Sequence, residues 1–303
     1  MNICMVVSYD GSRFAGWQKN VNTGRKRALQ TVFEEILSDY FSQEVRVHAA
    51  GRTDAGVNAM GQVFNFHLSG KGSDGVKFSE MPDAGGWEEL CLALNLFMRQ
   101  RLNSDEAGAV AIRLVSVVPS RFHSRFDAVG KTYEYYFDEG ERANVFARAY
   151  AFSAGHTLDL FAMREAAGYL VGTHDFSMFS SVRVKKDGGL LGQSDRIPGA
   201  ERDTVRTISD ISVERVGIKH SSCNLVRVSV TGDGFLYHMV RILSGTLYEV
   251  GCKTRKAENV KELLECGERA DTGVLLPGNA LFLRRVYYKE HGNQFSINRK
   301  NNV

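Results

Sequence analysis

Hydrophobic positions in the first part of the chain change their period several times. Residues 3–9 form an apolar, β-prone run that ends at Asp10-Gly11, which predicts a strand followed by a turn. From Ala28 the apolar residues fall at helical spacing as far as Tyr40, which predicts an amphipathic helix. Further patterns predict strands at 44–50, 61–68 and 109–118 and a helix at 87–101. The predicted element order is β-α-β-β-α-β.

The second part of the chain repeats this order. It predicts strands at 131–137, 205–216, 224–230 and 281–288, and helices at 158–170, 235–250 and 257–266. We therefore predict an α+β fold of two pseudo-symmetric β-α-β-β-α-β halves, with mainly antiparallel sheets that join. Helices would pack on the outer faces, with a catalytic cleft between the halves. The expected domains are 1–125 and 126–290, with a basic loop inserted near 180–203 and a polar tail at 291–303.

Composition indicates the class of protein but not its function. The 303 residues are 43% hydrophobic and 24% charged, as in an ordinary globular protein. The five cysteines form no C-x-x-C pair, so neither zinc nor a disulfide framework is indicated. The first apolar run is too short for a signal peptide, and no later run has the length of a membrane span, so we expect a cytoplasmic protein. A net charge of +3 identifies no partner by itself.

The densest chemical signal is Ala49-Ala50-Gly51-Arg52-Thr53-Asp54-Ala55-Gly56-Val57. Two glycines bracket a charged pair at the end of a predicted strand, where a scaffold presents functional side chains. Taken alone, the composition favours a tight turn with a locally paired Arg52 and Asp54, because Asp and Gly are the commonest turn residues.

A second signal alternates basic and aromatic residues. It runs through Pro119-Ser120-Arg121-Phe122-His123-Ser124-Arg125-Phe126 and continues in Lys131-Thr132-Tyr133-Glu134-Tyr135. Such alternation is typical of surfaces that hold phosphates and stack bases. It is equally typical of a strand with one core face and one solvated face. In either case Tyr133 and Tyr135 lie on one strand face, because they are two residues apart.

A third signal is Gly232-Asp233-Gly234-Phe235-Leu236-Tyr237-His238-Met239-Val240-Arg241. Its apolar spacing predicts a helix that buries Phe235 and Met239. His238 and Arg241 would be neighbours on its surface, three residues apart. An ordinary helix with a solvated histidine and arginine also accounts for this segment.

In this order the segments resemble the TruA-type tRNA pseudouridine synthases. The similarity begins with Tyr9-Asp10-Gly11 and Gly16-Trp17-Gln18 and includes the three signals above and His174-Asp175-Phe176. It implies that Asp54 is the catalytic aspartate, Tyr133 contacts the target uracil, Arg241 pairs with the aspartate and Arg52 assists base extrusion. It also implies a homodimer that modifies the anticodon stem-loop of tRNA, at tRNA positions 38, 39 and/or 40, without a cofactor or metal.

Three positions depart from the pattern of that family. Asn58 stands where histidine is common, Tyr237 where arginine is common, and Ala280 where glycine is usual. None of them is among the four residues with implied catalytic roles. The departures therefore bear on substrate range more than on activity.

The basic residues near these motifs are candidate contacts to RNA. The expected set is Lys19, Arg25, Lys26, Arg121, His123, Arg125 and His238, with Arg27, Lys185 and Lys186 as further phosphate contacts.

Two other functions fit parts of the pattern. A catalytically inactive RNA-binding module of the same fold would keep the basic surface. A metal-dependent nuclease would need several carboxylates around Mg²⁺ in addition to Asp54.

Overall fold

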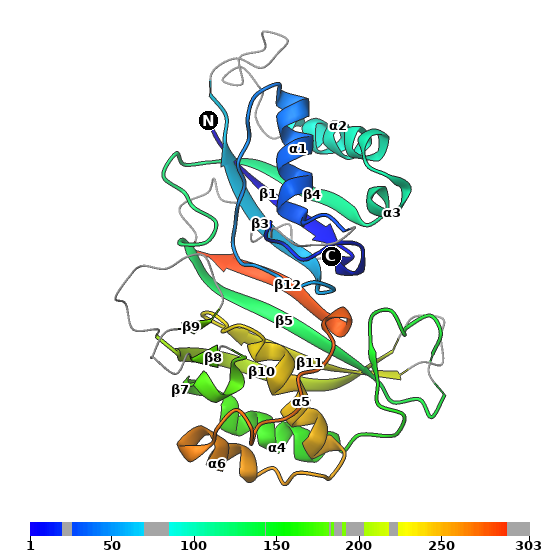
Figure 1. Cartoon of the computed structure of the whole chain (residues 1–303), viewed down its shortest axis with the longest axis vertical. Helices are drawn as coiled ribbons and strands as arrows, with labels where there is room; N and C mark the ends of the chain where they lie inside the picture. Colours follow the sequence, from blue (N-terminus) through cyan, green and yellow to red (C-terminus); the bar gives the residue numbers. More distant parts are fainter. Residues whose placement is uncertain are drawn as a thin grey trace. The chain divides into compact units, whose positions relative to one another are not determined.

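The computed structural model describes residues 1–19, 26–69, 85–142, 144–181, 183–184, 190–191, 203–217 and 224–289 (Figure 1). It contains two compact units: Met1–Lys131 with the chain from Phe282 onward, and Thr132–Leu281. The predicted division placed the last strand in the second half, whereas the structure groups it with the first unit. Arg25, Lys185, Lys186, most of the expected loop at 180–203 and the tail at 291–303 lie outside the described residues.

The N-terminal unit is built on four strands in the order β4-β1-β3-β12. Their bounds are β1 Asn2–Tyr9, β3 Asn58–His67, β4 Val110–Val118 and β12 Leu281–Tyr288. β1 is antiparallel to both β3 and β4, and the short β2 (His48–Ala49) also pairs with β3. β12 runs parallel to the beginning of β3, with Phe282 opposite Asn58. The last strand of the chain therefore flanks the start of β3.

Helices α1 (Leu29–Phe41), α2 (Gly85–Arg101) and α3 (Ser104–Ala107) complete this unit. The apolar face of α1 packs on the sheet, where Phe33 lies 4.9 Å from the Phe64 ring of β3. On α2, the Asn95 side chain donates to the Ile112 carbonyl of β4 at 2.9 Å and accepts its N–H at 2.9 Å. Apolar and polar contacts thus fix the helices to the strands.

The second unit contains strands in the order β5-β11-β10-β7. Their bounds are β5 Ala128–Asp138, β7 Gly172–Asp175, β10 Val205–Gly217 and β11 Asn224–Gly232, with β6 (Phe152–Ser153) beside the end of β5. A separate pair is formed by β8 (Arg183–Val184) and β9 (Leu190–Leu191). Helix α4 (Leu160–Leu170) packs against β10 and against α5 (Met239–Gly251) and α6 (Asn259–Cys266).

The α+β class is confirmed, and both stretches of chain show the expected order of main elements. The pseudo-symmetry of the halves stays a prediction. In the described part of the chain, no helix is long and apolar enough to span a membrane.

The strand predicted at 44–50 is mostly absent, because only His48 and Ala49 pair with a neighbour. The reason is visible in the hydrogen bonds of the preceding residues. The N–H of Val45 donates to Ser38 Oγ at 2.9 Å, and that of Val47 to Glu34 Oε1 at 3.2 Å. Side chains of α1 thus take the donors that a strand partner would have used.

The helix predicted at 235–250 begins later, at Met239. His238 precedes it in the left-handed region with φ 65°, a conformation that interrupts a right-handed helix. Phe235 therefore lies in the approach to the helix and not on its buried face. His238 therefore caps the helix from outside its first turn, and Arg241 lies within that turn.

Candidate active site

Asp54 lies in the loop between β2 and β3, and the residues of this loop just before it are anchored. The Thr53 carbonyl accepts the Trp17 N–H at 2.9 Å, and the Thr53 hydroxyl shares a 2.8 Å hydrogen bond with Tyr9. Before Asp54, the Gly51 carbonyl accepts the side-chain amide of Gln62 at 2.8 Å. Three strand or turn residues therefore fix the backbone that presents Asp54.

The turn after β1 approaches the same loop too closely for a side chain. At Gly16, where φ is +94°, a Cβ would lie 2.9 Å from the Thr53 carbonyl oxygen. At Gly11 it would lie 2.0 Å from the Val57 carbonyl oxygen. The Gly11 N–H instead donates to Oδ1 of buried Asn58 at 2.9 Å. The unusual Asn58 thus holds the turn against the loop.

The side chains of the charged pair differ in exposure: Asp54 is half-buried and Arg52 is exposed. A second cation reaches this loop, because a Cβ at Gly51 would lie 3.2 Å from Nζ of Lys131. The sequence analysis gave Lys131 no role of its own. Its only signal was its place at the head of the Lys131-Thr132-Tyr133-Glu134-Tyr135 segment.

Tyr9 acts in this loop as a neutral hydroxyl. Burial is the main cause that raises its pKa well above the ordinary value, although its hydrogen bonds to Thr53 and Gln62 oppose the rise. Tyr9 therefore bridges Thr53 and Gln62, and its hydroxyl stays protonated near neutral pH. No sequence motif predicts this bridging role, since the three positions are distant in sequence.

Tyr133 is buried on β5, in the second unit. Its ring meets the ring of Phe235 edge-on, with centroids 5.2 Å apart and planes at 84°. This is a favourable aromatic geometry that fixes the ring. The Gly234-Phe235 part of the third sequence motif thus supports the tyrosine of the second motif.

Arg241 lies in the first turn of α5, where it is half-buried. Its Nε donates to the Leu276 carbonyl at 2.6 Å, and the next carbonyl, of Pro277, accepts the Tyr135 hydroxyl at 3.0 Å. Burial raises the pKa of Tyr135, and the positive charge of Arg241 opposes this rise. The segment at 276–277 therefore fixes both side chains.

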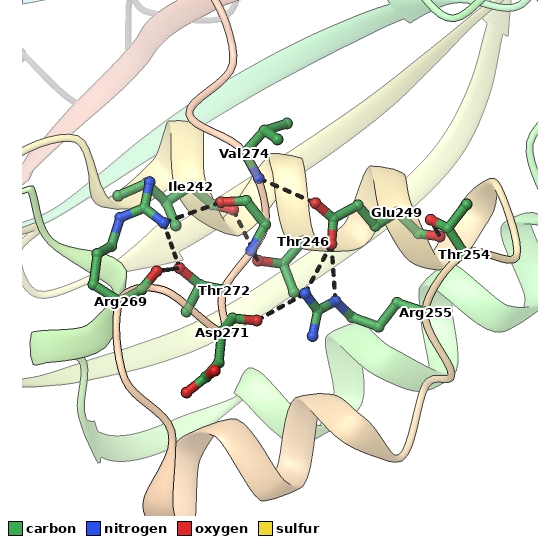
Figure 2. A network of polar contacts seen from close by, with 10 residues as sticks. Ile242, Thr246, Glu249, Thr254, Arg255, Arg269, Asp271, Thr272 and Val274 are labelled. Atoms are coloured by element: carbon green, nitrogen blue, oxygen red, sulfur yellow. Dashed lines mark hydrogen bonds and ion pairs between the residues drawn. The ribbon is translucent and has the colours of Figure 1, made fainter.

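The chain just before that segment, at residues 273–274, is tied to α5 by a polar network (Figure 2). Buried Thr246 donates to the Ile242 carbonyl at 3.0 Å and accepts the Gly273 N–H at 2.9 Å. Glu249 accepts the Val274 N–H at 3.2 Å and a guanidinium N–H of Arg255 at 2.8 Å. The chain that leads to the Leu276 carbonyl is thus held against the helix that carries Arg241.

His238 lies immediately before α5 and stacks on the Tyr237 ring, with centroids 3.7 Å apart. The Tyr237 that replaces an arginine of the family pattern therefore has a defined partner. Contact of His238 with RNA stays a prediction.

The candidate phosphate contacts of the N-terminal unit differ in their surroundings. Lys26 donates to the Ser12 carbonyl at 2.7 Å, and Arg27 forms ion pairs with Glu35 and Glu106. Exposed Lys19 borders a surface depression lined by the acids Glu34, Glu35, Asp39 and Glu44. Carboxylates oppose phosphate binding there, so Lys19 and Arg27 are weaker candidates than the exposed Arg121 and Arg125.

Within the described ranges, no group of three or more His, Cys, Asp or Glu side chains is arranged to hold a metal ion. The arrangement that the structure does offer is a half-buried carboxylate on a rigid loop. Such a group can act as a nucleophile or as a base.

Comparisons with known proteins agree in their family. A family model described as tRNA pseudouridine synthase matches residues 5–81 and 166–289. The chain is 35% identical over 290 residues to tRNA pseudouridine synthase A 2 of Clostridium tetani (strain Massachusetts / E88), covering 95% of this chain and 98% of that protein. It is 37% identical over 283 residues to tRNA pseudouridine synthase A of Anoxybacillus flavithermus (strain DSM 21510 / WK1), covering 93% and 96% respectively. Asp54 and Arg241 lie within the matched stretches, and Tyr133 lies between them.

Proposed function

Because this chain belongs to the tRNA pseudouridine synthase family and is an isomerase that acts on tRNA, we propose that it converts uridine to pseudouridine in the anticodon stem-loop, at one or more of the three tRNA positions named above. The supporting observation is the anchored loop that presents Asp54, inside the stretch that matches the family. The family relation and the RNA substrate also support a cytoplasmic homodimer in which each tRNA touches both subunits.

The reaction is an isomerisation, which one carboxylate can support. The N1–C1′ bond breaks, the uracil turns, C5 bonds to C1′, and the C5 proton is lost while N1 gains one. Atoms and electrons balance without an external oxidant or reductant. Glycoside hydrolases need a second acid for a poor leaving group, but uracil departs as a stabilised anion. Asp54 attacks C1′ as a nucleophile or removes the C2′ proton as a base.

The target base must leave its stack before Asp54 can reach the sugar, at a cost of a few kcal/mol. We assign Arg52 to the vacated space, since it is exposed and two residues from Asp54 on the same anchored loop. We assign Arg241 to the stabilisation of negative charge at the reacting centre. The hydrogen bond between its Nε and the Leu276 carbonyl supports this role, because it fixes the guanidinium in one orientation.

The proposal is tested with a tRNA transcript labelled with tritium at C5 of uridine. We expect tritium release that continues in EDTA and that disappears when the candidate anticodon-stem uridines are replaced by cytidine. An inactive RNA-binding module would bind this tRNA without release. A metal-dependent nuclease would instead cut the RNA and stop in EDTA.

The uracil contact assigned to Tyr133 predicts a specific defect in Tyr133→Phe. The ring still packs against Phe235, so tRNA affinity is expected to persist. We assign the Tyr133 hydroxyl to relay of the C5 proton, so without it the rate of product formation should fall about 10²-fold or more, as on loss of a proton-transfer group. Single-turnover kinetics and filter binding measure the two quantities.

The matched control is Tyr136→Phe on the same strand. The Tyr136 hydroxyl donates to Glu134 at 2.7 Å and has no proposed contact with RNA, so this variant should keep its rate. A loss of affinity in Tyr133→Phe would reassign Tyr133 to docking.

A further inference from the structure

Three rings form a continuous row on the N-terminal unit. The His48 and His123 rings lie 5.1 Å apart, and the His123 and Phe126 rings lie 4.4 Å apart. The Arg125 guanidinium carbon lies 5.9 Å from the Phe126 ring centroid. We call His48, His123 and Phe126 the ring row. His123 belongs to the second sequence motif, whereas His48 lies outside all three motifs. No role proposed so far uses the row as a whole.

Buried polar contacts fix the segment that carries His123. Asn2 of β1 donates to the Phe122 carbonyl at 2.8 Å, and Asn65 of β3 accepts the Ser124 N–H at 2.9 Å. Tyr288 of β12 donates to the Ser124 carbonyl at 2.8 Å. Three strands therefore hold the backbone on both sides of His123, the middle ring of the row.

The row is open to solvent at both ends. Phe126 is 76% exposed and His48 is exposed, whereas His123 between them is half-buried. A single exposed phenylalanine needs no explanation. An exposed phenylalanine that continues a row of fixed aromatic rings offers a flat face for another ring to stack on.

The charge around the row is that of a nucleotide site. Exposed Arg121 and Arg125 flank His123 in the sequence, while the nearby carboxylate of Asp127 accepts the His123 N–H at 2.8 Å. Burial, with the charge of His48 as a second cause, lowers the pKa of His123, so its ring is neutral near neutral pH. A row of rings with arginines beside it suits a planar base that carries phosphates.

We propose that the ring row is a stacking subsite for an unpaired base of the RNA substrate, with Arg121 and Arg125 at the adjacent phosphates. This inference rests on the proposed function for the identity of the ligand as RNA. It adds a residue set, His48 and Phe126, that the family motifs did not assign to RNA binding.

Affinity of the full-length protein for a short oligouridylate, and for its abasic counterpart with the same phosphates, tests the proposal. The wild type should prefer the strand with bases. Phe126→Ala should bind the strand with bases roughly 5- to 100-fold more weakly, the range seen when one stacking side chain is removed. It should also lose most of the preference over the abasic strand. Phe126→Trp should retain the preference and Phe126→Leu should lose it, because a planar ring is required.

The control is Phe161→Ala, since Phe161 on α4 is 78% exposed and belongs to no ring row. It should leave both affinities unchanged. The proposal is overturned if Phe126→Ala and His48→Ala keep the preference for bases, or if Phe126→Leu binds like the wild type.

Failure of the proposed function gives a different result. If the wild type prefers bases but releases no tritium from tRNA, the stacking subsite is supported and the proposed isomerase reaction is rejected. If the wild type releases tritium but shows no preference for bases, the isomerase reaction is supported and the stacking subsite is rejected.

Discussion

Asp54→Asn is expected to lower the single-turnover rate of pseudouridine formation by at least about 10²–10⁴-fold, the contribution of a positioned proton-transfer group. Asparagine has nearly the same shape but is neither a base nor a nucleophile. The contacts that anchor the loop use the backbone of Gly51 and Thr53 and the Thr53 hydroxyl, so the substitution leaves them in place. Affinity for tRNA, measured by filter binding, should therefore change little.

Asp39→Asn is the matched control for this loss. Asp39 is an exposed carboxylate on α1, in the same unit, and has no proposed contact with the reacting uridine. Its variant should turn over tRNA at the wild-type rate. A folded Asp54→Asn protein with a wild-type rate would reject the mechanism, whichever of the two chemical routes is assigned to the carboxylate.

Arg241→Ala should reduce kcat by about 10²–10³-fold, the effect of removing one preorganised charge-stabilising donor. We expect a smaller change in KM, because the role assigned to Arg241 is charge stabilisation at the reacting centre and not docking of the tRNA. Arg241→Lys should recover only part of kcat. It keeps the charge but loses the planar group whose Nε donates to the Leu276 carbonyl.

Arg164→Ala is the control for losing an arginine that donates to a backbone carbonyl, as distinct from losing a charge at the reacting centre. Arg164 lies on α4 in the same unit, and its Nε donates to the Val213 carbonyl at 2.8 Å. Loss of this contact should leave kcat within about twofold, since surface contacts away from the site have small effects. Equal losses of kcat in both variants would mean that Arg241 matters only for folding.

The regular elements were predictable where one physical pattern dominates. The last described strand, Leu281–Tyr288, matches its prediction because a short run rich in aliphatic and aromatic residues has the length and composition of a strand. The strand at 44–50 failed because its N–H groups meet side chains of α1, which no local pattern reveals. The predicted start of α5 was wrong because the apolar spacing continues through His238, whereas the helical backbone conformation does not.

The candidate site shows the same difference between local patterns and tertiary contacts. The family resemblance picked out Asp54, Tyr133 and Arg241, since the motifs taken alone also fit an ordinary turn, strand and helix. The groups that hold them were hidden, because Tyr9, Gln62 and the Leu276 carbonyl act through tertiary contacts between distant positions. The ring row was hidden for the same reason, since His48 carries no signal until its neighbour at position 123 is known.

The pairing of β12 with β3 has a consequence for synthesis on the ribosome. Arg284 and Met60, which touch across this pair of strands, are 224 positions apart, so the beginning of β3 gains its parallel neighbour only after β12 has emerged. Until then the beginning of β3, directly after the loop of Asp54, has an uncovered edge, and such edges can pair with other chains. The surroundings of the carboxylate loop are thus completed only when β12 has been synthesised and has paired.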